Sequence, residues 1–478
     1  MNPWQWECFE QVLDGRIIKL IEPGPLTQPV RSFSIRRDEK RNLVLETVAV
    51  GVLKRARDGH PLGTIRTLTE TVGFEGPGGT RATAKGVHPG DNTERTNEDG
   101  ARECKEISYV SALEVSVQPG ATHYVIDWLE NVNRGPFVWL GEMIRDRSTP
   151  SDSRTIGDGD TAIKFKGGPR RDASHHAALE LNVGGVTLFL CEAPDVQDRV
   201  SPGFIVYHGA PDEQTRRRIR NVVSFAMGVG FIYLGSSSFD EDSKLLATYA
   251  VSGNPFGDRL FEFSADPPAP LGPTGTNIAE QANLSRVSAA LYNHYDEMNF
   301  DALSWGYWHA ICAPIHMKPA HFGSAIEGLQ DAYCQAHTDK ARKRLIQDKT
   351  TAKALRDRLN AALSEVKLDE ALATIFERKI SNLNEVSGTV LSQRILAELG
   401  LAVGPADEAA WTRRNEAAHG KPRRPEDTIP VMRDTKLLRL LLNRMVLKIA
   451  KASPTYVDDY TPNLAIRALS QAVPISEA

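Results

Sequence analysis

Arg414, Asn415 and His419 are the residues of this chain whose types and spacing best suit chemistry on a phosphate. Arginine offers a two-pronged donor fork to a phosphate, and imidazole transfers protons near neutral pH. Gly420 is a good helix stop and prolines follow it closely, so the sequence predicts a helix over 406–419. His419 is then expected on the last turn of that helix.

Helix geometry limits how these three side chains work together. Asn415 and His419 are four positions apart and share a face. Arg414 and His419 are five apart, which places them about 140° apart around an ideal helix. Two such helices across a two-fold axis would bring two arginines and two histidines into one cleft. The spacing therefore favours phosphodiester chemistry at a site shared by two copies of the chain.

The run RNEAAHG at 414–420 resembles the R-N-x-x-x-H motif of HEPN ribonucleases (higher-eukaryote and prokaryote nucleotide-binding domains). The segment HFGSAIEGLQDAY at 321–333 is similar to the "LE-x-L" helix of that family, and YVDDY at 456–460 resembles the tail of its ApeA-like branch. Proteins of this branch act in anti-phage defence and place a β-rich region before a C-terminal HEPN domain. The motifs match at a few residues, whereas the layout covers most of the chain.

This resemblance implies a metal-independent endoribonuclease that leaves a 2′,3′-cyclic phosphate and a 5′-hydroxyl. His419 would be the general base or acid, Arg414 would hold the phosphate and Asn415 would orient the histidine or a phosphate oxygen. It further implies a role in abortive infection, with cellular RNA, tRNA first, as the substrate. The protein would form a homodimer or a higher even oligomer, use no cofactor and respond to a phage-derived trigger at its N-terminal region. The alternative is a non-catalytic HEPN sensor or scaffold that dimerises and recruits partners.

Several further residues are candidates for the same site. Glu327 is a possible accessory acid from an early helix, although a surface salt bridge is the preferred interpretation. Four basic residues are candidates for RNA binding, and for the last three a solvated loop explains the charge equally well: Arg413, Lys421, Arg423 and Arg424.

Two other clusters are weaker. A helix predicted over 212–235 carries a basic group near its start, which either contacts nucleic acid or forms a solvated first turn: Arg216, Arg217, Arg218 and Arg220. Four potential metal ligands lack the two tight pairs of a zinc site, so no metal is predicted there: His309, Cys312, His316 and His321.

The composition narrows the class of protein. The 478 residues are enough for two or three domains. Five scattered cysteines without a CxxC pair suggest reduced thiols and a cytoplasmic protein. The most apolar stretch, 437–449, is interrupted by charges, so no membrane contact is expected. Residues 316–452 hold 24 Lys and Arg against 17 Asp and Glu, a net charge of +7, which leaves −11 elsewhere. One module is thus suited to face phosphate.

The chain is predicted to be an α+β multidomain protein. Residues 1–263 hold short β-branched runs separated by turns, which predicts sandwich-like antiparallel sheets with a sensing or regulatory role. Within them, 76–102 and 147–160 read as loops. Prolines and glycines in 264–276 predict a stiff linker. Downstream, apolar residues recur at helical spacing. Connecting helices are expected over 277–315 and an all-α HEPN bundle over 316–470.

Overall fold

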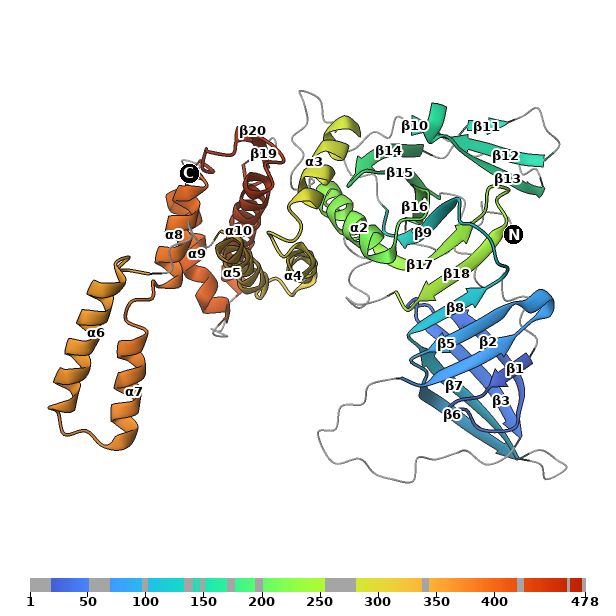
Figure 1. Ribbon diagram of the computed structural model, residues 1–478, viewed down its shortest axis with the longest axis horizontal. Helices are drawn as coiled ribbons and strands as arrows, with labels where there is room; N and C mark the ends of the chain where they lie inside the picture. The colour runs from blue at the N-terminus through green and yellow to red at the C-terminus, as the bar shows by residue number, and fades with distance from the viewer. Residues whose placement is uncertain are drawn as a thin grey trace. The chain divides into compact units, whose positions relative to one another are not determined.

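The computed structural model describes residues 19–50, 69–96, 102–132, 141–142, 144–146, 151–169, 177–193, 201–253, 281–337, 344–418, 425–461 and 465–474. An antiparallel β-rich region over 19–251 is followed by helices over 281–449 (Figure 1). The predicted α+β class is therefore confirmed. The described residues form two compact units that divide between Ala289 and Ala290. The predicted linker, 264–276, lies outside the described residues.

The larger sheet of the N-terminal unit has eleven described strands, and each neighbouring pair is antiparallel. Its strand β9 is buried along its whole length, including its two carboxylates, Asp127 and Glu130. In sheet order the strands are β1 (Lys19–Glu22), β4 (Thr71–Glu75), β5 (Arg81–Lys85), β8 (Ala112–Ser116), β18 (Leu245–Val251), β17 (Ile232–Phe239), β9 (Tyr124–Glu130), β16 (Gly203–His208), β15 (Val186–Glu192), β14 (Ala177–Val183) and β10 (Gly141–Glu142).

Two smaller sheets complete this region. The two segments predicted as loops, 76–102 and 147–160, contain strands, so that prediction is wrong for them. The first sheet contains β2 (Val30–Arg37), β3 (Leu43–Val50), β7 (Arg102–Val110) and β6 (His88–Thr96), and the second sheet contains β11 (Ile144–Asp146), β12 (Ser151–Ile156) and β13 (Ile163–Pro169). Strands β5 and β6 lie inside 76–102, and β12 lies inside 147–160. Gly86 lies in the short turn between β5 and β6, and its φ of 63° is a left-handed conformation that glycine adopts easily.

Helix α2 (Glu213–Met227) is shorter than the helix predicted over 212–235. Its first turn is capped by Asp212, whose carboxylate accepts the backbone N–H of Thr215 at 2.7 Å. Gly228 ends it with a left-handed φ of 70°. Strand β17 then begins at Ile232, so the apolar residues after the glycine extend a sheet rather than the helix.

The C-terminal unit is mostly helical, and α5, α9 and α10 pack on one another (Figure 1). Helix α4 packs on α5, and α8 contacts α5 as well. Helices α6 and α7 pack against each other, and neither has a buried residue. Helix α3 (Gln281–Asn293) contains the point at which the two units divide. The later helices are α4 (Phe300–Cys312), α5 (Lys318–Ala336), α6 (Lys349–Ser364), α7 (Glu370–Ser381), α8 (Gly388–Glu398), α9 (Pro405–Ala418) and α10 (Thr428–Ile449), followed by the strand pair β19 (Thr455–Asp458) and β20 (Ala465–Ala468).

Helix α10 contributes more buried apolar residues to this unit than any other element that the structure describes. The apolar stripe expected from its sequence is buried: Leu438, Leu441, Leu442, Met445 and Ile449. Arg444 is also fully buried, and its guanidinium donates to the carbonyls of Ala402 at 2.7 Å and Leu469 at 2.9 Å. Every residue of α10 from Leu437 to Leu447 is buried, and α9 packs against this helix. Among the described residues, every helix is too short or too polar to span a bilayer.

Candidate functional site

Helix α9 carries Arg414 and Asn415 of the predicted motif, and its first turn is fixed from inside the protein. Pro405 is the first residue of α9. The carboxylate of Asp407 accepts the backbone N–H of Gly404 at 3.0 Å, which satisfies a donor at the start of the helix. Burial raises the pKa of Asp407, although that hydrogen bond and the charge of Arg444 oppose the shift. The anchored first turn sets the direction in which the later residues of α9 point.

Arg414 lies between α9 and α5 and is 8% exposed. One of its terminal nitrogens donates to a carboxylate oxygen of Glu327 on α5, and the other donates to Oδ1 of Asn415 at 2.9 Å. Its guanidinium carbon lies 3.5 Å from the centroid of the Trp411 ring, which is cation–π geometry. Three contacts with different chemistry thus fix the plane of this guanidinium.

A glycine on α5 makes room for the arginine side chain. A Cβ atom at Gly323 would lie 2.5 Å from Cδ of Arg414 and 2.9 Å from its Nε. Such separations are closer than van der Waals contact, so no larger residue fits here while Arg414 keeps its place. The predicted early helix over 321–333 therefore contributes both the gap for the arginine and, at Glu327, its carboxylate partner.

The side chains of Arg414 and Asn415 converge instead of diverging around the helix. The long arginine side chain bends back, so its guanidinium meets the amide oxygen of the next residue. Asn415 and Glu327 are both exposed, and the Glu327 side chain is 52% exposed. The group is therefore open to solvent on its Asn415 and Glu327 side and closed on its Trp411 side, where the ring covers the guanidinium.

Arg413 points to another partner. Its Nε and one terminal nitrogen donate to the two carboxylate oxygens of Asp434 on α10, with the Nε contact at 2.9 Å. These bonds raise the pKa of Arg413. Asp434 is nearly buried, whereas the Arg413 side chain is 45% exposed. The residue predicted to bind RNA thus also ties α9 to α10, and the carboxylate offsets its charge.

The remaining predicted residues of the site lie outside the described residues. These are His419 and the basic residues that follow it, Lys421, Arg423 and Arg424. Their roles stay predictions.

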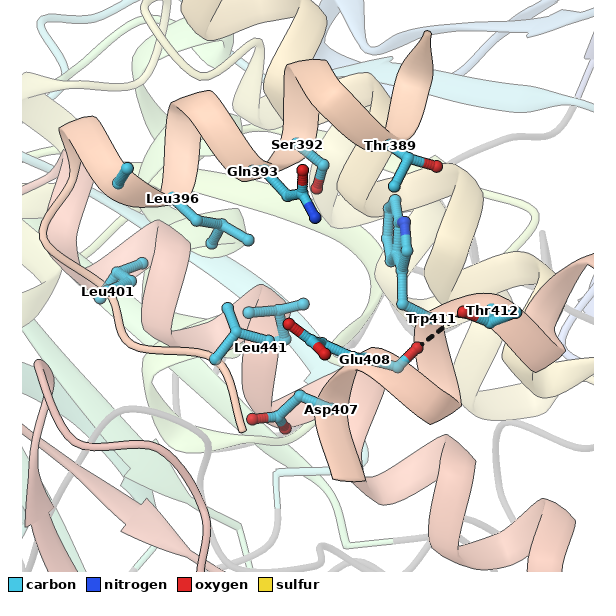
Figure 2. Close-up of a pocket in the computed structure, with 12 residues that line it drawn as sticks. Thr389, Ser392, Gln393, Leu396, Leu401, Asp407, Glu408, Trp411, Thr412 and Leu441 are labelled. Carbon is cyan, nitrogen blue, oxygen red and sulfur yellow. Dashed lines mark hydrogen bonds between the residues drawn. The ribbon is translucent and has the colours of Figure 1, made fainter. Parts of the chain in front are cut away.

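A pocket of about 360 Å³ lies between α8 and α9, and Trp411 is one of the residues that line it. Apolar side chains such as Leu396, Leu401 and Leu441 form much of its wall (Figure 2). Glu408 extends from α9 toward the middle of the pocket, and Gln393 reaches toward it from α8 (Figure 2). The pocket thus combines an apolar wall, an aromatic ring and a few polar groups, which is typical of a small-molecule site.

Two arginines of the basic cluster in α2 make buried ion pairs that the sequence did not predict. Arg216 and Arg220 are buried, and both donate to the carboxylate of Asp127 on β9. Glu213 pairs with both arginines from the first turn of α2. The interpretation as a solvated first turn is wrong for these two arginines, because they hold α2 on the sheet through a buried carboxylate.

One of the histidines considered as metal ligands, His309, makes other contacts. His309 lies against the ring of Trp305, with centroids 3.7 Å apart, and its Nδ1 is 2.8 Å from the Trp305 carbonyl oxygen. Within the described ranges, no group of three or more His, Cys, Asp or Glu side chains is arranged to hold a metal ion.

Comparisons with known proteins return no match: no family model fits the chain, and neither a curated protein nor a solved structure is significantly similar to it.

Three residues of the site were missed by sequence reasoning: Trp411, Gly323 and Asp434. Trp411 is three positions before Arg414, so the contact of neighbouring side chains on one helix face was the available indication. Gly323 and Asp434 lie on other helices, and nothing local in their sequence points to α9.

Proposed function

We propose that the chain is a metal-independent endoribonuclease of the HEPN type that acts in anti-phage defence by abortive infection. The observation that supports this proposal is the position of Arg414. Its guanidinium is fixed by Glu327, Asn415 and Trp411 in the second half of α9, five positions before residue 419 in the sequence. A guanidinium held in one plane can donate to the non-bridging oxygens of a phosphate, where negative charge grows during cleavage.

Each motif residue has one role in the proposed reaction. The 2′-hydroxyl of RNA attacks the adjacent phosphorus, and the bond to the 5′-oxygen of the next nucleotide breaks. His419 takes the proton of the 2′-hydroxyl or returns one to the leaving 5′-oxygen. Arg414 binds the phosphate through N–H groups that Glu327 and Asn415 do not use, since a guanidinium has five donors. Asn415 orients the imidazole or a phosphate oxygen.

Glu327 is a positioning residue in this proposal. Its carboxylate meets Arg414 from α5 and fixes the direction of the guanidinium. The same carboxylate offsets the positive charge, so a phosphate competes with it for the arginine. Cellular RNA, tRNA first, is the proposed substrate, and a second copy of the chain supplies the other half of the cleft. The β-rich region takes the role of responding to a phage-derived trigger.

The second candidate is a non-catalytic scaffold that dimerises and recruits partners. The ion pair between Arg414 and Glu327 favours it, because a paired arginine is also what a purely structural contact requires. The two candidates differ in whether removing the arginine changes any chemistry.

RNA cleavage by the purified chain separates these functions. End-labelled tRNA is incubated with the protein, and products ending in a 2′,3′-cyclic phosphate are counted. We expect Arg414→Ala to lower the rate by about 10²–10³-fold, as loss of a transition-state donor does, and His419→Ala to lower it at least as much. Arg433→Ala, which removes an exposed arginine from α10, is the matched control and should cut normally. Unchanged cleavage by Arg414→Ala would contradict the proposal.

A further inference from the structure

The pocket between α8 and α9 has walls whose chemistry is specific enough to identify a ligand. Its volume of about 360 Å³ lies at the small end of the range of small-molecule sites, ~300–1,000 Å³. The indole ring of Trp411 stands at one end, and apolar side chains from α8 and α10 line the other (Figure 2). A flat ring next to an apolar wall suits a flat, weakly polar ligand such as a nucleobase.

The polar groups of the pocket select among the bases. Glu408 brings a carboxylate, which only accepts hydrogen bonds, and Gln393 brings an amide, which donates as well as accepts. Guanine presents two adjacent donors, N1–H and the 2-amino group, beside the acceptor O6. Adenine and cytosine present one amino group beside a bare ring nitrogen, and that nitrogen would face the carboxylate as a second acceptor. Uracil offers a single N–H between two carbonyl oxygens.

We propose that this pocket binds a guanine base, stacked on Trp411, with Glu408 accepting from N1–H and the 2-amino group and Gln393 donating to O6. The donor and acceptor order of the base then matches that of the two side chains. Asp407 lines the same pocket and adds negative character, which disfavours a phosphate inside it. The base therefore enters the pocket while its phosphates stay outside.

Trp411 connects this pocket to the candidate active site. Its ring lines the pocket and also lies under the guanidinium of Arg414, at 3.5 Å from centroid to carbon. A base that stacks on the ring thus contacts the residue that orients the arginine. The inference rests on the proposed function in this one respect: the base belongs to the RNA whose phosphate Arg414 binds. A free guanine nucleotide is the other source of the same chemistry.

Binding is tested with guanosine and the intact chain by isothermal titration calorimetry. We expect saturable binding that weakens at least about tenfold with inosine, which lacks the 2-amino group, because a hydrogen bond to a charged acceptor is lost. Glu408→Gln should weaken guanosine binding at least as much and remove the preference over inosine. Glu370→Gln, on α7 and outside the pocket, is the matched control. No saturable guanosine binding, equal affinity for the four nucleosides, or unchanged binding by Glu408→Gln overturns the proposal.

Cleavage assays then identify the source of the base. If it comes from the substrate, replacing one guanine of an RNA oligonucleotide by inosine slows cutting by the wild type but not by Glu408→Gln. If it is a free nucleotide, added guanosine changes the rate on an RNA without guanine. Failure of the enzyme proposal looks different: guanosine still binds, but no RNA is cut. Cleavage that is normal in Glu408→Gln, with no guanosine binding in the wild type, overturns the pocket proposal alone.

Discussion

Replacing Gly323 by alanine tests whether the place that Arg414 takes beside α5 is the one that its function requires. The added methyl group would lie 2.5 Å from Cδ and 2.9 Å from Nε of Arg414. Because both atoms belong to a flexible side chain, the arginine swings away before the backbone of α5 moves. Its guanidinium then loses the positions beside Glu327, Asn415 and Trp411 together.

The structure sets the size of the effects. Alanine is favoured over glycine inside a helix by up to about 1 kcal/mol, whereas crowding of a packed site costs about 1–3 kcal/mol. The unfolding free energy of Gly323→Ala should therefore stay within about 2 kcal/mol of the wild type. RNA cleavage should fall much further, by about tenfold or more, toward the loss of about 10²–10³-fold expected when one transition-state donor is removed.

Gly328→Ala is the matched control. It lies on the same helix, next to Glu327, and its added Cβ would meet no atom within 4 Å. It should gain up to about 1 kcal/mol of stability with cleavage unchanged. Initial rates on labelled RNA and thermal melting are measured for the wild type and both variants. Wild-type cleavage by Gly323→Ala, alongside an inactive Arg414→Ala, would refute the reasoning, because the arginine would then act from another position.

Three further predictions concern assembly, metal and pH. Mixing chains that carry Arg414→Ala with chains that carry His419→Ala should restore part of the cleavage, because a shared site receives one intact arginine and one intact histidine; full activity per chain at concentrations where mass measurements show only monomer would contradict a shared site. Cleavage should continue in excess EDTA, since the proposed roles use side chains alone, and a loss that a divalent metal restores would show the opposite. Burial works to raise the pKa of Asp458, but hydrogen bonds from Arg467, Thr461 and the backbone outweigh it and lower that pKa below its ordinary value of 3.8. Its carboxylate therefore adds stability above that ordinary value, and the contribution is lost as the pH falls through the lower folded pKa. Asp458→Asn should lower the unfolding free energy near pH 7 by about 2 kcal/mol, and thermal melts should show the difference shrinking toward pH 3; a difference independent of pH would contradict the assignment.

The sequence alone determined features that depend on neighbours along the chain. Helix α9 (Pro405–Ala418) was predicted over 406–419, because a proline, two acids and a terminal glycine are local start and stop patterns. The buried stripe of α10 followed from its periodicity in the same way. The order of a β-rich region and a helical region was also readable, since strand and helix patterns repeat with different periods.

Local patterns failed where a strand and a loop use the same residues. The segment 76–102 is polar and rich in glycine, and it was read as a loop. The structure builds β5 and β6 from it, because neighbouring strands supply the hydrogen bonds that its composition does not suggest. The helix predicted over 212–235 likewise ran past Gly228, whose left-handed backbone ends it.

Only the tertiary structure decided what surrounds the charged residues. Glu327 reaches Arg414 across 87 positions of sequence, and Asp434 reaches Arg413 across 21. Asp127 pairs with two buried arginines of α2, Arg216 and Arg220, which lie 89 and 93 positions away in the sequence. The role of Gly323 is to leave space for the arginine side chain, and no local sequence pattern indicates such a role. A sequence pattern fixes the face on which a side chain leaves its helix, but the partner on that face depends on which distant segment packs there, and that choice is made by the whole fold.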